Sequence, residues 1–138
     1  MKRVIFICTH NSARSQMAEG LLRHLAGERF QPYSAGTAPT RLHPLAVAAM
    51  QEIGIDISGQ RAKDVREYAE RKFDYVITVC DQAREACPIF PGARHQLHWS
   101  LPDPEAADGD ETARLIAFRQ VREDLAARIR RLMEGADP

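Results

Sequence analysis

Cys8 and Arg14 lie six positions apart in a segment that could bind and attack a tetrahedral oxyanion. A tight loop between a strand and a helix can turn successive backbone N–H groups inward, and the N-terminus of the helix adds its own positive end. The planar guanidinium of Arg14 suits such an anion. Together these groups are expected to stabilise a Cys8 thiolate and lower the pKa of its thiol. We therefore interpret Cys8 as a nucleophile. The predicted oxyanion-binding residues are Thr9, His10, Asn11, Ser12, Ala13, Arg14 and Ser15.

Two side chains of this loop have further expected roles. Ser15 can donate a hydrogen bond to the thiolate or to a leaving oxygen, and Asn11 can bond the loop backbone and hold a strained turn. The spacing of Cys8 and Arg14 by itself favours a buried cysteine at a strand end with a surface arginine nearby. The surrounding pattern favours function, because a strand precedes the loop, Asn and two Ser lie within it, and a helix follows.

Cys80 and Cys87 form a second candidate group. If one continuous helix joins them, seven residues separate them along the axis by about 10 Å, whereas a disulfide needs Cα atoms within about 7 Å. The segment 81–86 is short and polar and is followed by Pro88, so it could unwind and let the sulfurs join. We expect a thiol relay, although either cysteine alone is more simply interpreted as a small buried hydrophobic residue.

Apolar runs and their periodicity predict the elements that carry these residues. A continuous apolar run predicts a buried strand over 3–7, and YVITV predicts a second one over 75–79. Further strands are predicted over 30–34 and 95–99. Helical periodicity predicts helices from 15 to about 26, over 44–53 and over 63–71, and a long final helix with an apolar stripe over 115–132. Asp108 or Asp110 can cap the start of this last helix.

The alternation of strands and helices predicts an α/β domain, single over residues 1–138, with a parallel sheet covered on both faces. In such folds ligands bind outside the carboxyl ends of the strands. Cys8, Cys80 and Asp103 each follow a predicted strand. We therefore expect these three residues to meet at one edge of the sheet.

The composition excludes several classes of function. Among 138 residues, 19 basic and 19 acidic side chains give a formal net charge of zero, whereas nucleic-acid-binding proteins usually carry a basic excess, so no nucleic-acid partner is expected. No signal peptide or membrane-spanning stretch is recognisable, and three cysteines do not suit a structural disulfide framework. We expect a cytoplasmic monomer with no membrane partner.

A metal site is not expected. His95 and His98 are three positions apart on a predicted strand, which places them on opposite faces. The spacing of the three cysteines and five histidines matches no zinc motif.

The loop CTHNSARSQMAEG resembles the signature loop of the low-molecular-weight protein tyrosine phosphatases and of the arsenate reductases built on their fold. YSAGT at 33–37, GIDISGQRA at 54–62 and LPDP at 101–104 agree, so the resemblance spans nearly the whole chain. It implies a three-layer domain with a mostly parallel four-stranded sheet and helices on both faces. It also implies that Cys8 is the nucleophile, that Arg14 binds the oxyanion and that Asp103, which precedes Pro104, is the general acid.

Three positions depart from the family pattern. His10 stands where many members have Gly, and Ala13 stands where many have Cys. Some arsenate reductases of this type bind a potassium ion near the loop, but Lys63 occupies a position that supplies a carboxylate there, so we do not expect that ion.

The second cysteine pair distinguishes two activities within the family. A phosphatase needs only Cys8, Arg14 and Asp103, whereas thioredoxin-coupled arsenate reductases carry a cysteine pair with the spacing of Cys80 and Cys87. The absence of aromatic residues just after Asp103 also differs from the tyrosine phosphatases. The resemblance thus implies arsenate as substrate, thioredoxin as reductant and no cofactor. A phosphatase acting through a Cys8 phosphocysteine is the main alternative, and a non-enzymatic thiol sensor or arsenite-binding module is a third.

Overall fold

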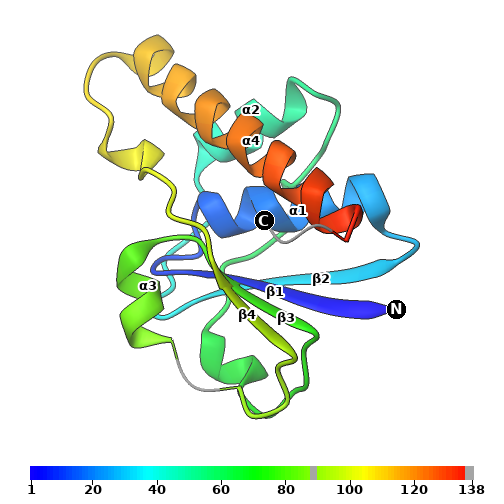
Figure 1. The fold of residues 1–138 in the computed structure, drawn as a ribbon. Coiled ribbons are helices and arrows are strands. Elements are labelled where there is room, and N and C mark those ends of the chain that lie inside the picture. The colour runs from blue at the N-terminus through cyan, green and yellow to red at the C-terminus, as the bar shows by residue number, and fades with distance from the viewer. Residues whose placement is uncertain (88–89, 136–138) are drawn as a thin grey trace.

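The computed structural model describes residues 1–87 and 90–135, whose centre is a parallel β-sheet (Figure 1). Its strands are β1 (Lys2–Cys8), β2 (Phe30–Gly36), β3 (Tyr75–Thr78) and β4 (His95–His98). Within the described residues the sheet has four strands in the order β2-β1-β3-β4, and every pairing is parallel. The expected α/β fold is confirmed, and its sheet is parallel throughout.

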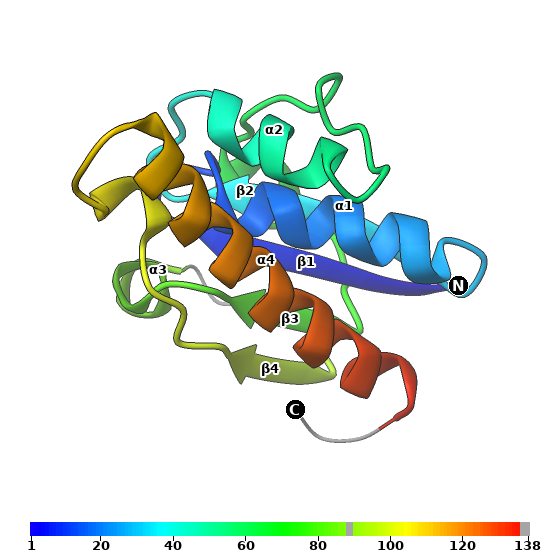
Figure 2. The ribbon, with the colours of Figure 1, turned by 90° about the horizontal axis from the view of Figure 1, so that it is seen from above.

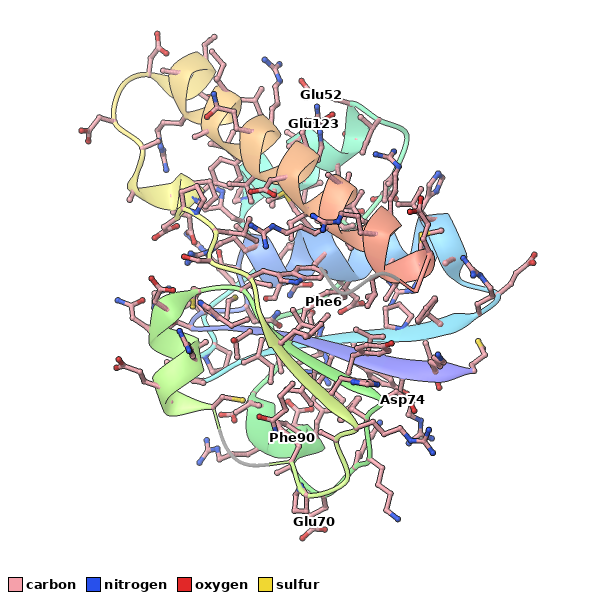
Figure 3. The ribbon with its side chains drawn as sticks, viewed as in Figure 1. Phe6, Glu52, Glu70, Asp74, Phe90 and Glu123 are labelled. Atoms are coloured by element: carbon pink, nitrogen blue, oxygen red, sulfur yellow. The ribbon has the colours of Figure 1, made fainter. Side chains whose placement is uncertain are left out.

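Strand β1 lies at the centre because its sequence is apolar on both faces. Val4, Ile5, Phe6 and Ile7 are completely buried, as expected for a parallel strand covered by helices on both sides. Figure 3 shows Phe6 in the interior, where its ring packs against Trp99 with a centroid separation of 5.9 Å. This packing fixes the end of β1, and therefore the backbone of Cys8.

Helices cover the sheet unequally. Helices α1 (Arg14–Ala26), α2 (Pro44–Gln51) and α4 (Glu111–Met133) lie on one face, and the short α3 (Asp81–Ala86) and the 3-10 helix η1 (Val65–Tyr68) lie on the other (Figures 1 and 2). A second 3-10 helix, η2 (Pro104–Ala106), leads toward α4. In residues 1–87 and 90–135, no helix combines the length and apolar character needed to cross a membrane.

Two arginines of α4 bind Glu52 at the end of α2 and so join the two helices. Glu52, directly after α2, accepts hydrogen bonds from Arg119 and Arg122, and Arg122 also binds Glu123 at 2.8 Å. Figure 3 shows Glu52 and Glu123 close together at this junction. The hydrogen bonds from Arg119 and Arg122 lower the pKa of Glu52 to about 2.

Several element boundaries differ from the sequence prediction. The helix predicted over 63–71 is only the 3-10 turn η1, which begins after the Asp64 cap and its reciprocal bond with Glu67. The strand predicted over 75–79 ends at Thr78, and the helix predicted over 44–53 ends at Gln51. Asp110, not Asp108, caps α4, because its side chain accepts from the backbone N–H of Ala113.

Candidate active site

The Cys8 loop connects β1 directly to α1. Cys8 is the last residue of β1 and is 3% exposed. The carbonyl oxygens of Cys8, Thr9, His10 and Ser12 all accept hydrogen bonds from backbone N–H groups of segment 37–43, at 2.7–3.1 Å. On the other side of the loop, the backbone N–H of Asn11 donates to the Cys8 sulfur at 3.2 Å. Hydrogen bonds to its carbonyl oxygens therefore hold the loop in place, and the backbone N–H of Asn11 points at the Cys8 thiol.

Asn11 occupies the one positive-φ position of this loop, at +50°. Its side chain stabilises that conformation: Nδ2 donates to Ser15 Oγ at 2.7 Å, and Oδ1 accepts from the backbone N–H of Lys63 at 2.9 Å. Gly36, at the end of β2, lies against the same turn. A Cβ atom at Gly36 would be 2.6 Å from the Thr9 carbonyl oxygen and 2.9 Å from the Asn11 nitrogen, so only glycine allows this approach.

Ser15 lies in the first turn of α1, with its hydroxyl 2.8 Å from the Cys8 sulfur. Because Asn11 donates to that same hydroxyl oxygen, the hydroxyl proton is available to the sulfur. Ser15 is fully buried. The arrangement gives a Cys8 thiolate two short-range donors, the Asn11 amide and the Ser15 hydroxyl.

Burial dominates the acidity of Cys8. Removal from water raises the pKa of the Cys8 thiol, while hydrogen bonds from Ser15 and the charge of Arg14 act to lower it, and Cys80 adds to the rise. The lowered pKa expected from the sequence is thus not found. The loop motif identifies the stabilising groups, but it contains no information about how completely the fold removes Cys8 from water.

Arg14 links the loop to the segment that carries Asp103. Its guanidinium donates to the Leu101 carbonyl at 3.0 Å and lies 3.9 Å from the Asp103 carboxylate. The Asp103 side chain is 45% exposed and caps η2 by accepting from the backbone N–H of Glu105 at 3.0 Å. Arg14, Cys80 and Asp103 line a cleft of about 560 Å³ at the carboxyl edge of the sheet. The two candidate catalytic charges therefore face one cleft.

Glu105 is a site residue that the sequence analysis did not single out. Its carboxylate accepts from Ser12 Oγ at 3.2 Å and lies 3.8 Å from Nε2 of His43, which caps α2 through Nδ1. Burial lowers the pKa of His43, and the Glu105 carboxylate opposes that effect. These contacts tie the Asp103 segment to the loop. The only sequence signal was the adjacency of Glu105 to Asp103-Pro104.

The remaining predicted loop residues differ in exposure. Thr9 is partly buried and contacts Cys80, with 3.3 Å between its hydroxyl oxygen and the Cys80 sulfur. His10 is exposed, and Ala13 is 3% exposed.

Cys80 and Cys87 stand at opposite ends of α3. Cys80 is 2% exposed and precedes the helix, whereas Cys87 is partly buried and follows it. All three cysteines are thiols in this structure. Burial raises the pKa of Cys87 to about 11. Ideal helix geometry over these seven residues corresponds to about 10 Å along the axis, so the hypothesis that α3 opens before a Cys80–Cys87 bond forms stays a prediction. Pro88 lies outside the described residues.

Hydrogen bonds of His98, in β4, join the start of α3 to β3 and β4. His98 bonds Thr78 Oγ1 through Nδ1 at 2.7 Å and Asp81 Oδ1 through Nε2 at 2.8 Å. His95, three residues earlier, instead stacks on Tyr75. The two histidines thus point to different partners. Among the described residues, no group of three or more His, Cys, Asp or Glu side chains is placed to hold a metal ion.

Comparison with known proteins identifies the family of this chain. Residues 3–137 match the family described as low molecular weight phosphotyrosine protein phosphatase, and the chain belongs to that family. Within the family, it is similar to the arsenate reductase of Shouchella clausii (strain KSM-K16), with 40% identity over 136 residues, covering 99% of this chain and 98% of the relative. The family resemblance carried by the loop motif is confirmed.

Solved structures of arsenate reductases are also similar to this chain. An arsenate reductase in the oxidized state is similar with a TM-score of 0.84 and 34% identity, covering 98% of each chain. A thioredoxin-dependent arsenate reductase of Corynebacterium glutamicum is similar with a TM-score of 0.72 and 33% identity, covering 98% of this chain and 61% of that one.

Proposed function

We propose that this chain is an arsenate reductase that converts arsenate to arsenite through Cys8, Cys80 and Cys87 and is regenerated by thioredoxin. One observation carries the proposal: a second buried thiol, Cys80, faces the oxyanion loop through Thr9, and a third, Cys87, follows it across a single short helix. The similarity to arsenate reductases over nearly the full chain supports it.

The first step is the attack of Cys8 on arsenic. Arsenate binds the loop N–H groups and Arg14, as expected for a tetrahedral oxyanion. The Cys8 thiolate, held by Asn11 and Ser15, forms a bond to arsenic. Asp103 gives its proton to the departing oxygen, which leaves as water. The product is a Cys8–arsenate adduct in which arsenic is still pentavalent.

The second step transfers electrons. The Cys80 thiolate attacks the Cys8 sulfur, the bond between sulfur and arsenic breaks, and its electron pair stays on arsenic. Arsenite leaves, and a Cys8–Cys80 disulfide remains. The contact between Thr9 and Cys80 orients the attacking sulfur toward the loop.

The third step returns Cys8 to its thiol form. The Cys87 thiolate attacks Cys80, which releases Cys8 and leaves a Cys80–Cys87 disulfide. The raised pKa of Cys87 makes its thiolate scarce while α3 is folded. Opening of α3 both exposes Cys87 and brings the two sulfurs within bonding distance. A dithiol protein, thioredoxin, then reduces the disulfide.

We further propose that the chain acts as a cytoplasmic monomer, in a single domain over 1–138. A reducing compartment keeps the three thiols ready for turnover. The steps above use only side chains of this chain, the substrate and the external dithiol, and they call for no metal or organic cofactor.

The decisive experiment is multi-turnover arsenate reduction coupled to thioredoxin, thioredoxin reductase and NADPH, with wild type compared to Cys87→Ser. We expect arsenate-dependent NADPH oxidation by the wild type and its loss in the variant after one turnover. The alternative is a phosphatase acting through a Cys8 phosphocysteine, which shares Cys8, Arg14 and Asp103. Hydrolysis of a phosphoester by wild type and Cys87→Ser alike, with no NADPH oxidation, would establish that alternative instead.

A further inference from the structure

The segment that contains Asp103 is attached to the oxyanion loop at two points. Before Asp103, the Leu101 carbonyl accepts from the Arg14 guanidinium at 3.0 Å. After it, the Glu105 carboxylate accepts from Ser12 Oγ at 3.2 Å. The two attachments use different residues of the loop, and the proposed mechanism gives a role to Arg14 but none to Glu105.

Glu105 also holds the Asp103 carboxylate through its own backbone. Its N–H donates to Asp103 Oδ1 at 3.0 Å, and Arg14 lies 3.9 Å from the same oxygen. Because both contacts use Oδ1, Oδ2 is the oxygen that we assign to carry the proton for the departing oxygen. Glu105 therefore connects two parts of the site: its amide orients the Asp103 carboxylate, and its side chain binds the loop.

His43 supports the Glu105 side chain from the start of α2. Nδ1 of His43 accepts from the backbone N–H of Leu45 at 3.0 Å, so the neutral ring carries its proton on Nε2. This Nε2 lies 3.8 Å from Glu105 Oε1, the oxygen that also accepts from Ser12. The His43 backbone N–H donates to the Ser12 carbonyl at 3.0 Å, and Phe118 of α4 packs on the His43 ring. The Glu105 carboxylate thus contacts groups that the packing of α2 and α4 holds in place.

Binding of arsenate is expected to change what Arg14 contacts. A charged oxyanion is a stronger acceptor than a peptide carbonyl, so the guanidinium is expected to turn toward the substrate and its bond to Leu101 to weaken. The hydrogen bond between Ser12 and Glu105 does not compete with the substrate, because the loop binds the anion through backbone N–H groups. This second attachment can therefore hold Asp103 in place while its proton is transferred.

We propose that Glu105 is a positioning residue for the general acid: its carboxylate attaches the Asp103 segment to Ser12, and its N–H holds Asp103 Oδ1, so that Oδ2 is directed to the departing oxygen. The inference rests on the proposed function and deepens it by naming the residue that places the acid. Glu105 is the acceptor in the Ser12 hydrogen bond and gives no proton to the substrate.

The catalytic part of the test is the rate of a single arsenate turnover by the reduced protein, with arsenite quantified at increasing arsenate concentration. Glu105→Ala should lower the maximal rate about tenfold, as loss of a hydrogen bond to a charged group would. The half-saturating arsenate concentration should change by less than about twofold, because the groups that bind the oxyanion remain. Glu105→Gln keeps an oxygen that accepts from Ser12 and should stay within about threefold of wild type.

Two further variants separate positioning from general damage. Asp103→Asn removes the acid, so the addition of Glu105→Ala to it should cause no further loss of rate if Glu105 acts through Asp103. Asp108→Ala is the matched control, because it removes an exposed carboxylate further along the same segment. This control should turn over arsenate like wild type.

A second readout needs no substrate. The backbone N–H groups of Ala106 and Ala107 make the hydrogen bonds that close η2, and their hydrogen–deuterium exchange reports how firmly η2 is held. Glu105→Ala and Ser12→Ala break the same hydrogen bond from opposite sides, and each should speed this exchange about tenfold. Glu105→Gln and the control should exchange like wild type.

Three results would overturn the inference. The first is a wild-type turnover rate or wild-type exchange at η2 in Glu105→Ala. The second is Glu105→Gln turning over as slowly as Glu105→Ala, which would make Glu105 a proton donor. The third is Glu105→Ala slowing the Asp103→Asn protein by the same factor as it slows the wild type.

The two readouts also keep this inference distinct from the proposed function. If Glu105→Ala fails to fold, Ser12→Ala tests the same hydrogen bond by both measurements. A wild type that reduces no arsenate refutes the proposed function. The exchange measurement involves no arsenate, so it still decides whether Glu105 holds the Asp103 segment against the loop.

Discussion

Substitution of Glu85 tests whether the relay requires helix α3 to open. Glu85 is exposed on this six-residue helix, so Glu85→Ala and Glu85→Gly change the same surface and remove the same charge. In a helix, glycine is about 1 kcal/mol less favourable than alanine. The dithiol state contains α3. In the proposed relay the disulfide state does not contain it intact, so the glycine variant should favour the disulfide.

The expected shift in reduction potential follows from the difference in helix propensity between glycine and alanine. About 1 kcal/mol corresponds to about a fivefold change in the dithiol–disulfide equilibrium, or about 20 mV in the Cys80–Cys87 reduction potential. The Gly variant should have the more negative potential. The assay equilibrates each protein with dithiothreitol redox buffers and counts thiols after acid quenching and alkylation.

A control separates the relay from general stability. Ala127 is exposed on α4, far along the chain from the cysteines. Ala127→Gly should lower the unfolding temperature but leave the potential unchanged. If the two Glu85 variants share one potential within the error of the titration, the Cys80–Cys87 bond forms without unwinding α3, and the reasoning is refuted.

Three further outcomes are expected. Ser15→Ala should raise the pKa of Cys8 further and slow its alkylation at pH 8 by about tenfold, because a hydrogen bond to a charged group contributes about 1.5 kcal/mol or more; an unchanged rate would contradict the assigned donor. Gly36→Ala should lower arsenate turnover by about 100-fold through displacement of the loop at Thr9, measured with folding checked by circular dichroism. Glu52→Gln should lower the unfolding temperature at pH 7 but much less at pH 2. The lowered pKa of Glu52 gives stability that is present above its unfolded value and is lost as the pH falls toward 2, so an equal deficit at both pH values would contradict the ion pairs.

The sequence was most informative where consecutive residues determine the structure. The apolar run before Cys8 predicted β1, the residues from Cys8 to Ser15 predicted the loop, and the periodicity of the last segment predicted α4. It was least informative at short elements. The segment predicted as a helix over 63–71 forms only a 3-10 turn, because the Asp64 cap starts one short turn and the chain then leaves it for the buried strand β3.

The sequence by itself determined the fold class, the family and the three thiols, because strand and helix periodicity and the loop motif are properties of neighbouring residues. Only the tertiary structure decided how these groups behave. Burial raises the pKa of Cys8 against the effect of its own loop. Glu105 reaches Ser12, and Lys63 reaches Glu19 and Ser34, across long stretches of chain. Such contacts depend on which elements pack together, and desolvation depends on the whole fold, so no local pattern of residues encodes either.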